Sequence, residues 1–182
     1  RPGEHTSTSL SSYDDSVKPE PPPRSEVTVR NQLDWVVTRS GYSFDDLVVA
    51  MRSGNPSNHE HADRNSVVLK YGGEVLLSDI RGVPYEHHHP GWFLRTSIAH
   101  NTVLVDGNGH QYHKGGEGTN ASDAAAKIVR FGERGGYCFW SSDATDAYAR
   151  VDNDIESVTR SVVVIHDQAV IFVVDKLVKR ST

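Results

Sequence analysis

The stretch from Val67 to Asp79 reads VVLKYGGEVLLSD, two apolar runs separated by a pair of glycines. Glycine accepts positive φ without steric cost, and Gly72-Gly73 has the two-residue spacing that primed hairpin turns favour. The sequence therefore predicts an antiparallel hairpin, with strands at residues 67–71 and 75–79.

Similar short runs, rich in β-branched residues, continue on both sides of this hairpin. They cover residues 35–38, 47–51, 102–105, 127–131, 137–140, 158–165 and 170–178, and turn residues separate most of them. No stretch shows a helical period of useful length. The fold class is therefore all-β, and the strand spacing predicts one antiparallel β-sandwich domain over residues 26–182. The last run ends close to Thr182, so we expect the sandwich to be truncated at its C-terminus.

The first 25 residues have a different composition. They contain many serines, a Pro-rich run at residues 19–23 and few apolar side chains, which cannot offset the entropy of ordering. We predict a disordered tail or linker there. The chain starts with Arg1 and no charged-then-apolar leader follows, so we expect a processed or cut end and a fragment of a larger protein.

Charge and composition exclude two classes of function. With 19 Lys+Arg against 24 Asp+Glu, the net charge is −5, which argues against a protein that neutralises nucleic-acid phosphates. The longest apolar stretch, Ala169 to Val174, is far too short to span a bilayer. The single cysteine, Cys138, lies in an apolar run and is expected to be a packed thiol; it leaves the redox compartment open.

Histidines in the segment from Asn58 to Asp63, which reads NHEHAD, suggest a metal site. Alternate residues of an extended chain face the same side, so His59 and His61 could share one site. Zinc takes imidazole nitrogen and carboxylate oxygen, and Asp79 and His100, at the ends of strand candidates, are further possible ligands. A bare His-x-His pair is more often a chance cluster on a polar loop, so the joint pattern is what favours a site.

The expected hairpin register raises one difficulty for this site. It sets Asp79 opposite Ser66, with His61 five residues further along, so residues 61–65 must bend or bulge for the two side chains to meet.

Other polar and aromatic residues receive simpler interpretations. The run His87-His88-His89 is read as a solvated loop, while His110 and His113 flank Tyr112 on a glycine-rich loop and are candidates for ligand contact. Trp35 and Trp140 lie within apolar runs and are expected in the core. Only Trp92 is expected to present a ring to a ligand.

Three segments taken together resemble a known family. NHEHADRNS at residues 58–66, GEVLLSD at residues 73–79 and RTSIAHNTVLVDG at residues 95–107 are similar to the heparinase II/III-like region of polysaccharide lyases. The resemblance covers roughly residues 34–111. It implies a supersandwich-like β-sandwich that follows an α/α-toroid domain of the same protein, with the active site between them.

The resemblance also implies a reaction and roles for single residues. Such proteins cleave acidic polysaccharides that contain uronic acid, of the heparin, heparan sulfate or alginate type, by β-elimination, and a periplasmic or secreted location would be expected. By resemblance, His61, Asp79 and His100 would hold Zn²⁺, His59 would face the substrate, and Tyr85 would have an acid/base or substrate role. We favour a structural role for the zinc, and we expect this chain alone to be inactive without the toroid.

Two alternative functions share features with this sequence. The segment from His59 to Asp63 is also similar to the metal motif of metallo-β-lactamase-like hydrolases, but Arg64 stands where that motif has histidine, and the alternating helices of that fold are missing. The second alternative is a non-catalytic carbohydrate-binding or architectural β-sandwich module, which would not bind zinc at His61, Asp79 and His100.

Overall fold

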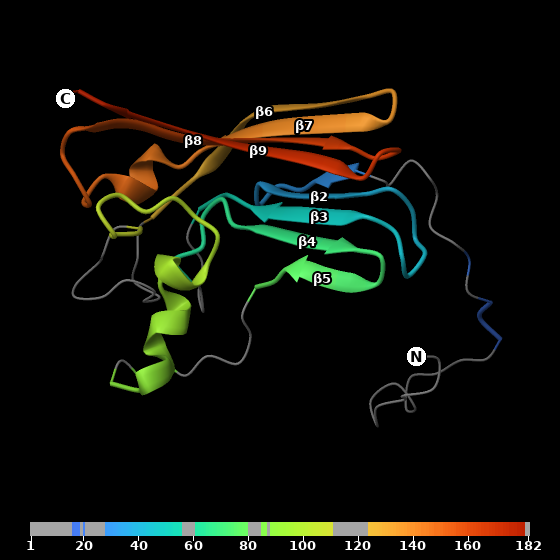
Figure 1. Ribbon diagram of the computed structural model, residues 1–182, viewed down its shortest axis with the longest axis horizontal. Coiled ribbons are helices and arrows are strands. Elements are labelled where there is room, and N and C mark those ends of the chain that lie inside the picture. The colour runs from blue at the N-terminus through green and yellow to red at the C-terminus, as the bar shows by residue number, and fades with distance from the viewer. Residues whose placement is uncertain are drawn as a thin grey trace.

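The computed structural model describes residues 16–18, 20, 28–55, 61–79, 85–86, 88–110 and 124–180. Two antiparallel sheets pack face to face, and a segment of short 3₁₀ helices lies beside one end of them (Figure 1). The all-β class and the antiparallel sandwich predicted from the sequence are confirmed. The predicted tail, residues 1–25, falls almost wholly outside the described residues and stays a prediction.

The first sheet has the strand order β1-β2-β3-β4-β5, so each strand pairs with its neighbour in the chain. Its strands are β1 (Thr28–Arg30), β2 (Trp35–Arg39), β3 (Val48–Arg52), β4 (Val67–Tyr71) and β5 (Glu74–Leu77). In β2 and β3, buried residues alternate with partly exposed ones, as expected of strands with one face on a core.

The second sheet has the order β6-β7-β8-β9. Its strands are β6 (Lys127–Arg134), β7 (Tyr137–Asp143), β8 (Ile155–Ile165) and β9 (Val170–Lys179). Buried residues alternate from Val158 to Val164 of β8, the longest strand of this sheet, so one of its faces lies on the core.

The predicted hairpin is present as β4 and β5. Gly72 and Gly73 both have positive φ, 60° and 78°, which is the backbone of a primed turn. Tyr71 pairs with Glu74 as expected, but a bulge at Leu69/Lys70 shifts the register by one residue further along. The bulge re-aims the end of β5, and the residues beyond Leu77 leave the ladder.

Side chains from both sheets form the core between them. Trp140 of β7 is fully buried, and its Nε1 lies 3.2 Å from Sδ of Met51 in β3. Cys138 is likewise fully buried, which confirms the packed thiol. Around them pack Val36, Val49, Val67, Ile128, Val162 and Val164.

The chain after β5 does not continue as strands. It forms the 3₁₀ helices η2 (Pro90–Arg95) and η3 (Ser97–Ala99), and the predicted strand at residues 102–105 is wrong. Only Val105 forms an isolated bridge, with Asn108. The side chain of Tyr148, from η4 (Thr145–Tyr148), donates a hydrogen bond to the Val103 carbonyl at 2.5 Å, so a side chain satisfies backbone that a ladder would otherwise pair.

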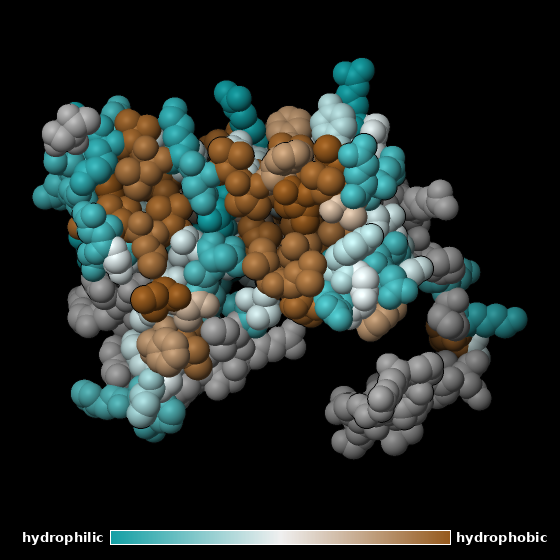
Figure 2. All heavy atoms as spheres, viewed as in Figure 1, coloured by the Kyte–Doolittle hydropathy of each residue, from teal (hydrophilic) through white to brown (hydrophobic). Residues whose placement is uncertain are grey.

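Apolar side chains remain exposed on the last strand of each sheet. Figure 2 shows brown surface across the middle of the face on which β5 and β9 lie in Figure 1. Leu76 of β5 is 54% exposed, and Phe172 and Val174 of β9 are 52% and 59% exposed. The described residues contain no helical segment with the length and apolar character of a membrane span.

Candidate metal centre

The backbone next to His61 is tied on both sides to the 3₁₀ segment. The Ala62 N–H donates to the Arg95 carbonyl at 2.8 Å, and the Ser97 hydroxyl donates to the Ala62 carbonyl at 2.8 Å. Because both backbone groups of Ala62 are paired with this segment, His61 is held beside the residues that lead to His100.

A tight turn follows at once and resolves the difficulty over register. The Ser66 N–H donates to the Asp63 carbonyl at 2.9 Å, and Asn65 has a φ of 65°. Asparagine tolerates this left-handed backbone better than most residues. The expected bend in residues 61–65 is therefore present, and it directs His61 back over the end of the hairpin.

Asn101 fixes the segment that carries His100. Its side-chain amide donates to the Val67 carbonyl and accepts from the Val67 N–H, both at 2.8 Å. His100 itself closes η3, with its N–H donating to the Ser97 carbonyl at 3.0 Å. The segment is thereby locked to the first residue of β4.

Arg160 of β8 anchors the same region from the second sheet. Its guanidinium donates to the carbonyls of Asn65 and Asn101, the first at 2.7 Å, and forms two hydrogen bonds to the Asp175 carboxylate at 2.7 and 2.8 Å. A single buried cation thus holds the bend after His61 and the residue after His100 against one sheet.

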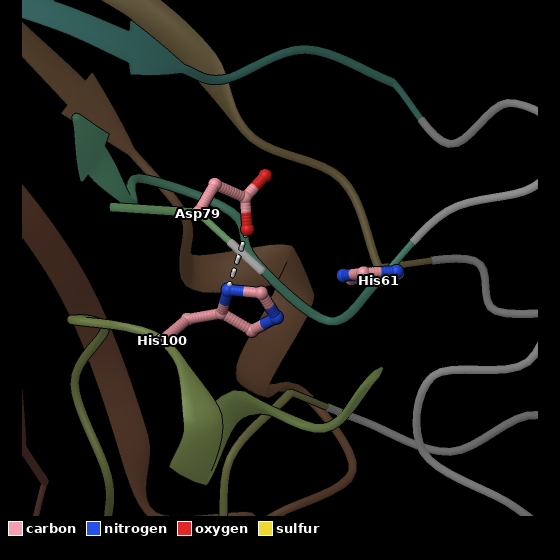
Figure 3. A group of neighbouring side chains, drawn as sticks. All are labelled: His61, Asp79 and His100. Carbon is pink, nitrogen blue, oxygen red and sulfur yellow. Dashed lines mark ion pairs between the residues drawn. The ribbon is translucent and has the colours of Figure 1, made fainter. Parts of the chain in front are cut away.

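These constraints bring His61, Asp79 and His100 together from three separate segments (Figure 3). One ligand atom from each lies within 4.8 Å of the other two, the single such group of three found in the described part of the chain. His100 Nδ1 lies 3.1 Å from Asp79 Oδ1, and the ring centroids of His61 and His100 are 5.3 Å apart. The predicted convergence of these three side chains is therefore observed.

The donor set suits zinc, although no ion is part of this structure. The ligands of a tetrahedral zinc at 2.0–2.1 Å stand about 3.3 Å apart, so the 3.1 Å separation of the Asp79–His100 pair fits such a site, and a ligand atom of His61 lies within 4.8 Å of both. The His100 side chain is fully buried, and neither ring nitrogen has a hydrogen-bond partner in the described residues, although Nδ1 faces the Asp79 carboxylate. Buried imidazole nitrogens without hydrogen-bond partners suit coordination to a cation.

Electrostatics keep His61 in the form that binds metals. Burial lowers its pKa first, and the neighbouring His100 lowers it further. The imidazole is therefore neutral near pH 7 and offers a lone pair. Asp79, whose side chain is 44% exposed, leaves the site open to solvent on one side.

Of the two predicted catalytic residues, the structure describes only Tyr85. His59 lies outside the described residues. Tyr85 is described and 60% exposed, and its ring lies over the Arg95 guanidinium, with 4.9 Å from the ring centroid to Cζ. Trp92 stacks on the same guanidinium at 5.1 Å and is only partly exposed.

Some interpretations of single residues are corrected. His110 is fully buried and packs edge-on against Tyr148, so it is not a ligand contact on a loop, while His113 lies outside the described residues. Trp35 is 42% exposed, because it starts β2 on the outer face and stacks under Arg52 instead of entering the core. Trp140 is in the core as predicted.

Sequence reasoning missed three supporting residues, Arg95, Asn101 and Arg160. The first two lie within the RTSIAHNT stretch, beside His100, where a basic and an amide side chain in an otherwise apolar setting were the available signal. Arg160 had a similar signal, as the one charged residue in the run at residues 158–165.

Comparisons with known proteins agree with this fold. A family model described as "Heparinase II/III-like, C-terminal" matches residues 22–182. The fold is similar to a mutant of the heparan sulfate lyase HepC from Pedobacter heparinus, with a TM-score of 0.68, 14% identity, and coverage of 84% of this chain and 22% of that one. It is also similar to a structure of heparinase III, with a TM-score of 0.62, 15% identity, and coverage of 83% and 22%. A search of curated proteins gave no match. The chain thus spans about a fifth of the length of the solved structures it matches.

Proposed function

This chain belongs to the heparinase II/III-like C-terminal family, and from that premise we propose that it is the β-sandwich part of a polysaccharide lyase that cleaves uronic-acid polysaccharides by β-elimination. The observation that carries the proposal is the convergence of His61, Asp79 and His100. The exposed Tyr85 is connected to this group through Arg95, on which it stacks and whose carbonyl accepts the N–H of the residue after His61. Substrates of the heparin, heparan sulfate or alginate type are included. Such polymers are too large to pass an inner membrane unaided, so we also propose a periplasmic or secreted location.

The reaction sets clear demands on the protein. A base removes the proton next to the uronate carboxylate, a double bond forms in the ring, and the glycosidic oxygen on the neighbouring carbon leaves with a proton from an acid. The carboxylate must also be neutralised, because charge builds on it as the proton departs. The products are a new reducing end and an unsaturated uronate.

We assign the protein's own groups to these demands as follows. The exposed Tyr85 is the candidate to hold or move a proton at the sugar ring. His59, which precedes His61 by two residues, is the candidate to meet the substrate. A zinc ion held by His61, Asp79 and His100 would supply positive charge and fix the two imidazoles. The remaining wall of the cleft would come from a helical domain of the same protein.

An activity assay of the whole protein tests the proposal. We expect unsaturated uronate, read as ultraviolet absorbance, from at least one of heparin, heparan sulfate and alginate. Tyr85→Phe should reduce kcat by about 100-fold or more, the usual contribution of general acid–base catalysis. The matched control is Tyr137→Phe in β7, where the tyrosine is 39% exposed, and it should leave kcat unchanged.

The alternative outcomes are distinct. Binding of these polysaccharides without any unsaturated product would favour the carbohydrate-binding module instead. If the two tyrosine substitutions have equal effects on kcat, Tyr85 has no role in the reaction. The lyase assignment would then be judged only by whether the wild-type protein forms unsaturated uronate.

A further inference from the structure

Arg95, the last residue of η2, has a buried guanidinium between two aromatic rings. The residue is only 2% exposed, and Cζ lies 4.9 Å from the ring centroid of Tyr85 and 5.1 Å from that of Trp92. A desolvated guanidinium attracts aromatic faces more strongly than one in water. The two rings are therefore held against one cation.

The same residue is joined to the metal centre through its backbone. Its carbonyl accepts the Ala62 N–H at 2.8 Å, one residue from His61, and Ser97 binds the other backbone group of Ala62. A displacement of Arg95 is therefore transmitted both to the loop that carries His61 and to the ring of Tyr85.

The orientation of the Tyr85 ring matters for the proposed reaction. Its side chain is 60% exposed, so packing covers less than half of it. Catalysis requires a reacting hydroxyl to stay near one geometry, and a displacement of about 1 Å can reduce a rate by roughly 100-fold. The contact of the ring face with the buried Arg95 guanidinium favours one orientation of the ring.

We propose that Arg95 is a positioning residue that holds the Tyr85 ring at the rim of the metal centre, with Trp92 completing the stack. Arg95 is too buried to reach a substrate, so it acts through Tyr85. This inference rests on the proposed lyase function and deepens it. A planar guanidinium can stack on two rings at once, whereas an ammonium cannot, so lysine should replace Arg95 only in part.

A double-mutant cycle in the whole protein tests the inference. We expect Arg95→Gln to lower kcat by about 10- to 100-fold with little change in KM, and Arg95→Lys to recover part of the loss. In the Tyr85→Phe background, Arg95→Gln should cost less than threefold more, because residues that act as a unit are not additive. The matched control is Arg39→Gln at the last residue of β2. It removes a stack between Arg39 and Tyr42 that has the same 4.9 Å separation, and it should leave kcat unchanged.

A purely structural role for Arg95 gives a different pattern. Full additivity of the two substitutions, or an unchanged kcat in Arg95→Gln, would overturn the inference. If Arg95→Gln does not fold, the cycle is run with Arg95→Lys, judged by the same additivity criterion.

A spectroscopic measurement separates this inference from the proposed function. If the wild-type protein yields no unsaturated uronate, the lyase proposal fails. The tryptophan emission of Trp92, obtained by difference from Trp92→Phe, then decides whether the stack exists: a change in Arg95→Gln supports it, and unchanged emission overturns it.

Discussion

Replacing Asn101 with alanine removes the two hydrogen bonds that join the His100 segment to β4. Both are 2.8 Å long, and their partner, Val67, is 1% exposed, so water cannot easily replace the amide. Two net hydrogen bonds at about 1 kcal/mol each, together with the cost of leaving two buried backbone groups unpaired, give a loss of about 2–4 kcal/mol. With a urea m-value of about 2 kcal/mol/M, the unfolding midpoint should fall by about 1–2 M.

Urea unfolding followed by Trp140 fluorescence measures this loss. The matched control is Asn108→Ala, which removes one 3.3 Å contact from an exposed side chain to the carbonyl of Asp106 and should cost less than about 0.5 kcal/mol. Equal midpoint shifts for the two variants would refute the reasoning, because the Asn101 side chain pairs with buried Val67 backbone and also accepts a 3.3 Å hydrogen bond from Arg160, whereas that of Asn108 has one exposed contact.

Three further predictions follow from single contacts. Burial lowers the pKa of His110 to about 3, against about 6.5 in the unfolded chain, so only the unfolded state takes up this proton as the pH falls below 6.5. This group alone should lower the free energy of unfolding by about 2 kcal/mol between pH 8 and pH 5. Urea unfolding at these two pH values should show that His110→Phe removes this part of the pH dependence. An unchanged pH dependence in His110→Phe would contradict the prediction. Arg160→Met should cost about 3 kcal/mol by thermal or urea unfolding, because it breaks a bidentate pair and strips two carbonyls of their donor, whereas Asp175→Asn should cost about 1. A smaller loss of stability in Arg160→Met than in Asp175→Asn would be inconsistent with Arg160 anchoring the two segments. Gly73→Ala should cost about 1–2 kcal/mol, because φ is 78° and a Cβ would lie 2.3 Å from the Phe44 ring, and a neutral result would contradict the primed turn.

The hairpin shows how far local sequence determined the fold. Gly72 and Gly73 predicted the turn correctly because positive φ is a local requirement. The bulge at Leu69/Lys70 was not predicted, since no residue there carries a local signal such as the glycine pair. Residues 102–105 had the composition of a strand, but the Val103 carbonyl pairs with the side chain of Tyr148, 45 residues away, and Val105 pairs with the backbone of Asn108.

The candidate site likewise has residues that the sequence predicted and residues that it did not. His61 was a candidate because of the His-x-His pair, and Asp79 and His100 because they stand at the ends of strand candidates; the family resemblance singled out these three as the ligand set. The anchor Arg160 was not, because its partners, Asn65 and Asn101, are 95 and 59 residues away in the chain, and no local pattern encodes that pairing. Arg95 was overlooked because its stacking partner Tyr85 lies in another segment.

Zinc stoichiometry, measured by elemental analysis after dialysis, tests the metal centre most directly. We predict one zinc per wild-type chain, a loss of it in each of His61→Ala, Asp79→Ala and His100→Ala, and full retention in His166→Ala, whose imidazole lies in the β8–β9 turn and contacts Thr38. Circular dichroism of each variant confirms that the fold is intact. A wild-type chain that holds no zinc, or folded variants at the three ligands that hold as much as wild type, would contradict the account.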